Sequence, residues 1–445
     1  MLRKLSVTVS SVVAAACLLI TAPTRAEPIW GGGTPLSAGT PTPGGTPNVA
    51  ANPAPQQGEY QALAWMKPGV RLSYYHSKGY QTAFGTDLEP DKDGNWIDKK
   101  TRKTYKDKPM SADAAAGGYG IQQHDIVGVE DGKVAVDIKA FLARPDVGCV
   151  VQKPGGLGMV GTYEAGPRLW LHPRVLAQQL ANAEANPPAP GELASVYRTT
   201  YQFGDRTVNA VRIVARGYGG YIQQTYDLET GIMLLETSAT HTQGVQEDIR
   251  DKRTDKPFDG TGPLVVTYTQ LLQCRQMKLP EAMLKTPLHP AFAAGQHLSW
   301  RGGFKSVIPG TENMPIPLQP MSFSVEVEDA GRTFSLVRIR ETTNGLPDNG
   351  DNRVVGPASL AGWMVSPALF QQNLQPGTVL DEDPITKSQI VFVGQGADGL
   401  MYVADRGPKA EFAYGYDPQT GICRRHIIHD QLTQMLYDNA LFPGE

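Results

Sequence analysis

The sequence predicts a β-rich α+β protein made of two tandem, related antiparallel-sheet domains. Three observations support this fold class. The chain has 445 residues, enough for two or three domains, and 40% of them are hydrophobic, enough to build real cores. It contains 48 glycines and 35 prolines, nearly a fifth of the chain, so turns and strands are favoured over long helices. Five short motifs also recur in the same order in its two halves.

The first 26 residues have the pattern of a secretory signal peptide. A positively charged start is followed by mostly apolar residues 5–22 and by the small-x-small site Thr24-Arg25-Ala26. We therefore expect cleavage after Ala26 and a periplasmic or extracellular protein. The stretch ending in Cys17 loosely resembles a lipoprotein box, so a lipid anchor on Cys17 is the less favoured alternative. No later stretch approaches the ~20 apolar residues that a membrane-spanning helix needs.

A Gly- and Pro-rich spacer is predicted at residues 27–57. Residues 31–57 hold six glycines and six prolines, and Leu36 and Val49 are their only sizeable aliphatic residues. Such a segment cannot bury a core, so we expect it to be disordered. It serves either as a tether for the folded part or as a leader without a role of its own.

The recurring motifs indicate an internal duplication, because matches in a fixed order are the signature of repeated units. They predict a first domain at residues 58–285 and a second at 286–445. The first is longer mainly because of a charged, Gly- and Ala-rich insertion at residues 85–118. The matched pairs are Gly69–Tyr74 with Gly295–Trp300, Val127–Lys133 with Val325–Arg332, His172–Leu180 with Ser366–Leu374, Tyr226–Ile232 with Tyr416–Ile422, and Thr269–Leu272 with Thr433–Leu436.

Local patterns predict the elements of each copy. Residues 325–328 alternate between valine and glutamate, and residues 134–139 alternate between large aliphatic side chains and small or charged ones. Such alternation is typical of half-buried strands. Residues 173–180 and 367–374 begin with proline, which the first helical turn tolerates, so both predict short helices. The first helix is expected to continue as far as Asn186, before two prolines end it.

A Tyr-Asp-x-x-Thr-Gly-Ile sequence predicts a hairpin turn late in each copy. The aspartate accepts backbone hydrogen bonds, and Pro418 supplies the φ angle that the second position of a turn requires. Gly231 and Gly421 take the left-handed conformation before the next strand begins.

This order of strands, helix and late Asp-x-x-Thr-Gly turn resembles the periplasmic half-barrel carriers of the lipoprotein-localisation type. The resemblance covers the later part of each copy. It implies a half-barrel-like sheet whose concave apolar face binds an acyl chain or a hydrophobic partner. The duplication and the insertion depart from the single-copy pattern, so the ligand type does not carry over.

Four aromatic residues at matched places are the candidate ligand-binding residues: Trp170, Tyr226, Trp363 and Tyr416. The more general interpretation is that they are core residues, since aromatic side chains bury large areas.

The acidic stretch with Asp91, Asp93 and Asp98 partly imitates a calcium loop. The position of the expected bidentate glutamate is Lys100, and more basic residues follow, so a solvated turn is favoured over a calcium site. We expect no metal and no cofactor.

Three cysteines remain after removal of the signal peptide. The turn match places Cys423 opposite Met233, so we expect Cys423 to pack as a small apolar residue. This leaves Cys149 and Cys274 as the favoured disulfide in an exported protein. A Cys274–Cys423 bond and three free thiols remain as alternatives.

Charge and motifs exclude several functions. The 41 Lys and Arg residues nearly balance the 44 Asp and Glu residues, so nucleic acid is not expected as a partner. The chain has no Gly-x-Ser-x-Gly, His-Glu-x-x-His or phosphate-loop motif. We expect an exported, non-catalytic binding or assembly protein for a hydrophobic small molecule or an envelope protein. The alternative is a secreted hydrolase with its site between the two domains.

Overall fold

The computed structural model describes most of the chain after residue 59. The described residues are 60–81, 88–90, 96–98, 104–105, 114–115, 119–144, 148–151, 157–166, 168–187, 194–217, 220–241, 264–307, 317–348, 350–431 and 435–442. The predicted signal peptide and spacer lie outside them, as do Asp91, Asp93 and the side chains of Asp98 and Cys149. Among the helices of the described residues, none has both the length and the apolar character needed to cross a membrane.

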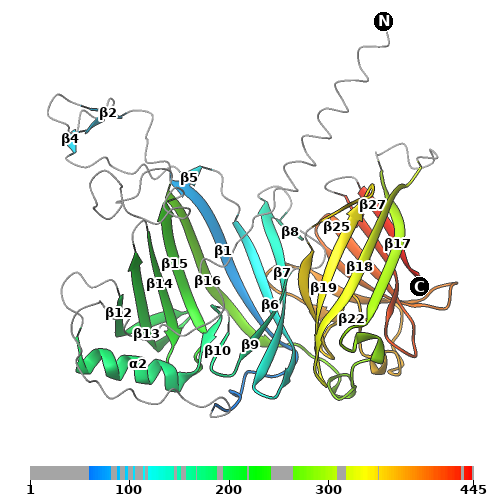
Figure 1. Cartoon of the computed structure of the whole chain (residues 1–445), viewed down its shortest axis with the longest axis horizontal. Coiled ribbons are helices and arrows are strands. Elements are labelled where there is room, and N and C mark those ends of the chain that lie inside the picture. The colour runs from blue at the N-terminus through cyan, green and yellow to red at the C-terminus, as the bar shows by residue number, and fades with distance from the viewer. Residues whose placement is uncertain are drawn as a thin grey trace, which may run out of the picture. The chain divides into compact units, whose positions relative to one another are not determined.

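The first large sheet is antiparallel and has two open ends (Figure 1). β5 (Ala114–Ala115) pairs with its strand β1, and β9 (Leu157–Thr162) pairs with β7. In spatial order its path is β12 (Ala194–Phe203), β13 (Arg206–Gly217), β14 (Gly220–Asp227), β15 (Met233–His241), β16 (Leu264–Gln276), β1 (Val70–Gln81), β6 (Tyr119–Glu130), β7 (Lys133–Arg144) and β8 (Gly148–Val151).

Two small sheets accompany it. In the predicted insertion, β2 (Leu88–Pro90), β3 (Trp96–Asp98) and β4 (Thr104–Tyr105) form a three-stranded sheet. Before the helix, β10 (Ala165–Gly166) pairs with β11 (Trp170–Leu171).

The second large sheet is also antiparallel with two open ends. β21 (Asp351–Val355) pairs with its strand β19. In spatial order its path is β22 (Val379–Glu382), β23 (Gln389–Gln395), β24 (Met401–Gly407), β25 (Ala410–Tyr416), β26 (Cys423–Asp430), β27 (Met435–Phe442), β17 (His297–Ser306), β18 (Gln319–Ala330), β19 (Ser335–Thr343) and β20 (Leu346–Pro347).

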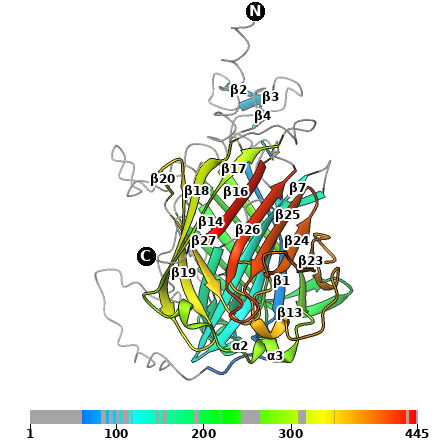
Figure 2. The same ribbon diagram turned by 90° about the vertical axis from the view of Figure 1, so that its right-hand side faces the viewer.

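The two large sheets have the same strand order. The path from β12 through β16 to β1, β6 and β7 corresponds to the path from β23 through β27 to β17, β18 and β19. Figure 2 shows β24 to β27 side by side in the second sheet. β22 has no counterpart in the described part of the first sheet. The β-rich antiparallel fold is confirmed, while the duplication and the domain boundaries stay predictions.

The two Asp-x-x-Thr-Gly turns have matching hydrogen bonds. Leu171 N donates to Gly231 O, and Val365 N donates to Gly421 O, both at 3.0 Å. The φ angles are 73° at Gly231 and 70° at Gly421. A Cβ atom on Gly231 would lie 2.2 Å from the carbonyl oxygen of Leu171, and one on Gly421 would lie 2.0 Å from that of Val365. Both positions therefore require glycine.

The apolar face of the first sheet packs against helix α2 (Pro173–Ala185). Leu72 and Tyr74 from β1 share one buried cluster with Leu176 and Leu180 from α2. Tyr74 donates its hydroxyl hydrogen to Met233 O at 3.0 Å, so the buried phenol is satisfied. The predicted helix is confirmed; it ends at Ala185, one residue earlier than predicted, and Asn186 is its C-cap.

The second sheet covers its apolar face with the segment before β22. Trp300 occupies the place of Tyr74 and donates its indole N–H to Cys423 O at 3.0 Å. The predicted helix at 367–374 is only the 3₁₀ turn η2 (Pro367–Leu369). Pro376 disfavours helical backbone at Gln375, so no helix continues past residue 374.

The segment that links the two sheets packs on the second core. Met277 and Met283 are buried in a cluster with residues of β23 to β26. Met283 belongs to helix α3 (Glu281–Leu284), and η1 (Pro290–Phe292) follows. The side chains around α3 therefore join the second core before the predicted boundary at 285/286.

Candidate functional site

A row of charged residues crosses the first sheet on the face opposite its core. Arg275 in β16, Arg71 in β1 and Asp125 in β6 are direct cross-strand neighbours. Arg71 lies on this face because it alternates with Val70 and Leu72, which belong to the core. Two arginines opposite one another on adjacent strands repel, so this row requires nearby anions.

The second sheet supplies two aspartates to this row. Asp381 in β22 accepts two hydrogen bonds from Arg275, both at 2.7 Å, and one from Arg71 at 2.9 Å. An Asp383 oxygen lies 3.6 Å from Arg71 Nη1 and 3.5 Å from Arg275 Nη2. Arg71 Nη2 also donates to Asp125 at 2.7 Å. We call these five residues the charge clamp.

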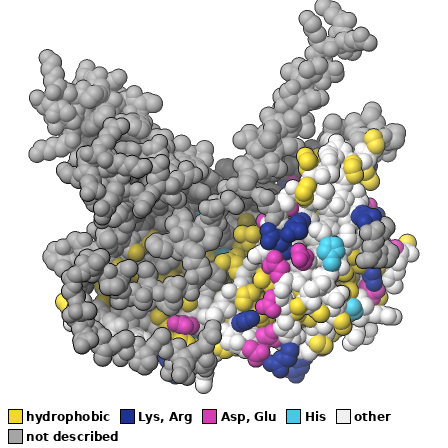
Figure 3. Space-filling model, in the orientation of Figure 1, with side chains coloured by type: hydrophobic (Ala, Val, Ile, Leu, Met, Phe, Trp, Pro, Cys, Tyr) yellow, Lys and Arg dark blue, Asp and Glu magenta, His cyan; other side chains and the backbone are white. Residues whose placement is uncertain are grey.

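Burial makes the charge clamp different from ordinary surface ion pairs. The side chains of Arg71, Asp381 and Asp383 are 2%, 5% and 0% exposed. By contrast, Lys133 and Asp329 lie 3.5 Å apart with more than half of each side chain exposed. Figure 3 shows charged side chains of both signs interspersed on one visible face. Exposed pairs contribute about 0–1 kcal/mol, whereas removing one partner of a buried pair costs about 3–5 kcal/mol.

The environment keeps Asp125 and Asp383 ionised. Burial opposes ionisation of Asp125, but the charge and hydrogen bonds of Arg71, with Lys139 and Arg275, outweigh it and lower the pKa of Asp125. Burial likewise opposes ionisation of Asp383. Hydrogen bonds from Thr386 and the charge of Arg71 outweigh that effect and lower the pKa of Asp383.

A tight turn positions Asp383. One of its oxygens accepts hydrogen bonds from Ile385 N at 3.0 Å and Thr386 N at 2.8 Å, which leaves the other oxygen facing the arginines. Asp383 N donates to Ser388 O, and Lys387 N donates to Asp383 O, both at 2.9 Å. This is the hydrogen-bond pattern of the two Asp-x-x-Thr-Gly turns. Lys387, with φ 60°, stands where those turns have glycine.

Two further ion pairs extend the contact along β7. Lys139 Nζ lies 2.7 Å from Asp405 in β24, and Arg353 in β21 lies 3.6 Å from Asp137. Burial raises the pKa of Asp137, with a small addition from the charge of Asp125, and Arg353 only partly opposes this. Burial on its own would lower the pKa of Lys139, but the negative charges of Asp405 and Asp125 outweigh this effect and raise the pKa.

Apolar packing surrounds these ion pairs. Val127 and Ala135 of the first sheet form a buried cluster with Phe334 and Val354 of the second. A Cβ atom on Gly158 in β9 would lie 2.2 Å from the backbone of Arg353. The two sheets therefore meet through close backbone contact as well as through charge.

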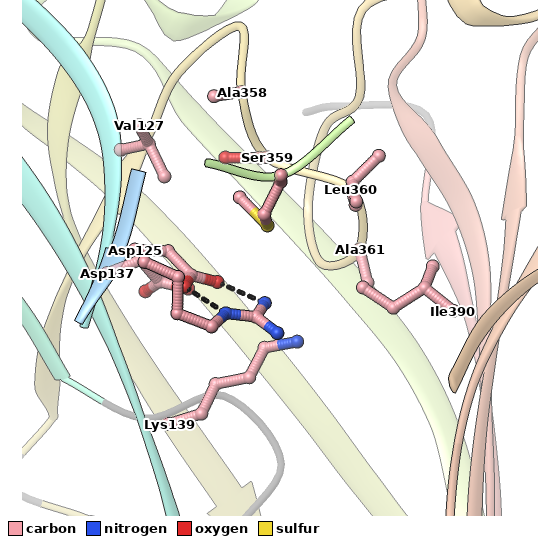
Figure 4. A pocket seen from close by; sticks show the side chains of 11 residues that line it. Asp125, Val127, Asp137, Lys139, Ala358, Ser359, Leu360, Ala361 and Ile390 are labelled. Atoms are coloured by element: carbon pink, nitrogen blue, oxygen red, sulfur yellow. Dashed lines mark hydrogen bonds and ion pairs between the residues drawn. The ribbon is translucent and has the colours of Figure 1, made fainter. Parts of the chain in front are cut away.

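A small cavity lies beside the charge clamp. In Figure 4, Asp125, Asp137 and Lys139 lie on one side, and Leu360, Ala361 and Ile390 lie on the other. Its volume is about 10 Å³, about the space that one water molecule needs. Substrate and ligand pockets have ≈ 300–1,000 Å³, so this cavity is far too small for either.

The predicted aromatic ligand residues lie in two separate places. Trp170 and Tyr226 are buried in the core of the first sheet. Tyr416 is buried in the second sheet and donates its hydroxyl hydrogen to Gly362 O at 3.0 Å. Trp363 is partly buried nearby. They do not form one site, and their proposed contact with ligand stays a prediction.

Trp170 and Trp363 are also not equivalent positions. Met233 N donates to Leu169 O, and Cys423 N donates to Trp363 O, both in the same place of the hairpin. Trp363 therefore corresponds to Leu169. The motif match was wrong at this point because a tryptophan stands near the helix start in both copies.

The expected Cys149–Cys274 disulfide is not formed, because Cys274 is a free thiol. The strand order gives the reason. Cys149 is in β8 and Cys274 in β16, and β1, β6 and β7 lie between them. Four steps of ~4.8 Å separate the two strands, whereas bonded cysteines need Cα atoms within ~7 Å. Cys423 is free and fully buried in the second core, as expected.

Metal ligands do not gather in the described residues, where no group of three or more His, Cys, Asp or Glu side chains is placed to hold an ion. His426 is buried, while His429, three residues along the same strand, is exposed. Burial lowers the pKa of His426 to about 4, which keeps its imidazole neutral near pH 7.

Sequence reasoning missed the charge clamp. Its contacts join residues separated by 106 and 310 positions, and no local pattern marks them. One signal was present. Asp383-Pro-Ile-Thr386 matches the Asp417-Pro-Gln-Thr420 turn, but Lys387 in place of glycine hid the likeness.

Comparison with known proteins adds little. No family model matches the chain, and no curated protein matches it. A solved structure that does match is the crystal structure of MucB, at 12% identity over 64% of this chain and 86% of that chain. The TM-score of 0.19 is too low to place this chain in the fold of that protein.

Proposed function

We propose that this chain is an exported, non-catalytic binding or assembly protein that presents two related, half-barrel-like sheets to a protein partner as one unit. The observation that carries the proposal is the charge clamp. Asp381 binds Arg71 and Arg275 of the other sheet with three hydrogen bonds, and its side chain is 5% exposed. Buried ion pairs gain little net stability, and we infer that this one instead fixes a single arrangement of the two sheets. A fixed arrangement of two surfaces is what a binding or assembly protein needs.

A protein partner is favoured over a hydrophobic small molecule. In each sheet the chain itself covers the apolar face, with Leu176 and Leu180 in the first and with Leu360 and Leu369 in the second. Among the described residues, these leucines occupy apolar face that an acyl chain would need, whereas strand edges and polar surfaces remain for a protein.

The secreted hydrolase is the weaker candidate. Its site would lie between the sheets, where Asp125 and Asp381 are neutralised by arginines and the adjoining cavity has about 10 Å³. A hydrolase needs a carboxylate or nucleophile that substrate reaches.

Chemical crosslinking in the native cell envelope tests the proposal. We expect the wild-type chain to be crosslinked to a protein partner in a constant molar ratio. Arg275→Lys, which keeps the charge but loses the two-pronged contact with Asp381, should lower the yield, and the exposed control Asp398→Asn should leave it unchanged. Hydrolysis of ester, glycoside or peptide substrates by the purified chain, lost in Asp381→Asn, would favour the alternative instead.

A further inference from the structure

The first sheet ends in a long strand with an open edge. All ten residues of β12 pair with β13, and among the described residues no strand pairs with the other side of β12. In an antiparallel pair, alternate residues direct both N–H and C=O away from the partner. β12 therefore presents a row of backbone donors and acceptors that a further strand fits.

The second sheet closes the equivalent edge. β23 corresponds to β12, and β22 covers it as an antiparallel strand with Val379 opposite Val391 and Glu382 opposite Gln389. The covering strand is acidic, since Asp381, Glu382 and Asp383 follow one another. The molecule thus contains an example of a strand that completes such an edge, with its carboxylates paired to the arginines of another sheet.

β12 lacks the features that protect an edge strand from pairing. It reads Ala-Ser-Val-Tyr-Arg-Thr-Thr-Tyr-Gln-Phe, with no proline, no lysine and one charge, Arg198. Valine, threonine, tyrosine and phenylalanine favour strands. Natural proteins usually place lysine, proline or a bulge on such an edge.

The charge around this edge favours an acidic occupant. Residues 194–217, which form β12, β13 and their turn, contain four arginines and one aspartate. The side chain of Arg198 is 58% exposed and lies 3.9 Å from Glu184 of α2, a weak surface contact. Arg212 lies over the ring of Tyr197, which is 42% exposed. A carboxylate on an added strand has cationic side chains within reach.

We propose that β12 is the docking site for an extended, acidic segment of a partner protein, which adds to the first sheet as an antiparallel strand. The mode is strand addition, in which backbone hydrogen bonds supply affinity and side chains supply specificity. The inference rests on the proposed function and names the part of the partner that is bound.

A peptide taken from the chain itself provides the probe. The capped peptide of residues 377–383 (Gly-Thr-Val-Leu-Asp-Glu-Asp) reproduces the strand that closes the equivalent edge. Added to the full chain, it should slow amide hydrogen exchange in residues 194–203. The twin with amides in place of its three carboxylates should bind at least tenfold more weakly, and the twin with Leu380→Pro should not bind.

Variants of the chain provide matched controls. Thr199 and Thr200 are neighbours, so the backbone N–H of one faces β13 and that of the other faces the open edge. Proline at either position removes that N–H. The outward substitution should abolish peptide binding and leave the melting temperature nearly unchanged. The inward one should lower the melting temperature. Arg198→Glu should weaken binding at least fivefold.

Four results would overturn the inference: peptide protection outside 194–203, equal binding of the neutral twin, full protection of β12 before peptide is added, or dimerisation of the chain through β12. The proposed function is tested separately by crosslinking. A partner that still crosslinks normally to the outward proline variant would refute strand addition and leave the proposed function standing.

Discussion

The two sheets carry different side chains, with different burial, at positions where their backbones correspond. Arg71 and His297 each stand two residues after a left-handed glycine, Gly69 or Gly295. Each is paired with an acidic residue on the next strand, Arg71 with Asp125 and His297 with Glu326. The first pair is buried in the charge clamp, whereas His297 and Glu326 are exposed. One backbone plan therefore supports either an interface or a free surface, and the side chains decide which.

Breaking the charge clamp should have the largest effect. Asp381→Asn leaves Arg71 and Arg275 buried side by side without their shared carboxylate. We expect the free energy of unfolding to fall by about 3–5 kcal/mol. Urea denaturation followed by circular dichroism measures it, with the exposed residue Asp398 as control, where Asn should cost at most about 1 kcal/mol. Equal losses for the two variants would show that the clamp contributes no more than a surface pair.

The matched corners should respond alike in the two sheets. Gly231→Ala and Gly421→Ala each force a left-handed alanine whose Cβ meets a carbonyl oxygen, so each should cost about 2–4 kcal/mol. Lys387→Gly, in the third turn, should instead stabilise by about 1 kcal/mol, because glycine accepts its φ of 60° without strain. Differential scanning calorimetry of the three variants checks both signs. A large difference between Gly231→Ala and Gly421→Ala would argue against equivalent corners.

Acid should reveal one buried histidine in each sheet, at positions that do not match. Burial lowers the pKa of both His124 and His426 to about 4, against about 6.5 in the unfolded chain. The unfolded state takes up these protons first, so stability should fall as the pH drops from about 6.5 to 4. Each histidine contributes about 1.4 kcal/mol per pH unit over this window.

Below that window the lowered pKa values of Asp125 and Asp383 should continue the loss. The raised pKa of Asp137 acts in the opposite direction and at higher pH, because this carboxyl takes up its proton in the folded state first. Urea titrations from pH 7 to pH 4 measure the slope. His426→Gln should reduce it by one proton. An unchanged slope in His426→Gln would show that this histidine does not titrate with folding.

The smallest expected effect concerns the cysteines. It compares one matched position in the cores of the two sheets. Met233 and Cys423 occupy the same place in their hairpins and are 2% and 0% exposed. Iodoacetamide should modify Cys274 in the native protein and Cys423 only after unfolding. Modification of Cys274 should leave the free energy of unfolding unchanged. Peptide mapping without reductant checks it. A linked Cys149–Cys274 peptide would contradict the strand order.

Local chemistry accounts for what the sequence predicts well. The turn at Gly231, the helix from Pro173 and the alternation from Val134 to Ile138 depend on neighbours along the chain, and all three are present. The alternation nevertheless predicts a half-buried strand, and this part of the prediction is wrong. Asp137 and Lys139 do not face solvent but ion-pair with the second sheet.

The rest depends on distant contacts. Nothing near Arg71 in the sequence shows that Asp381 will lie beside it, 310 positions away. The short second helix shows a similar limit. Its proline start at Pro367 matches that of Pro173, but the residues that follow end it after one turn.

The charge clamp also sets which surfaces are able to meet. The first sheet offers two arginines side by side, and the second offers two aspartates, so the contact has unlike halves. Stacking the arginine pair of one copy on the arginine pair of another would bury like charges, and stacking two aspartate pairs would do the same. The arginine pair and the aspartate pair therefore favour one another over second copies of themselves.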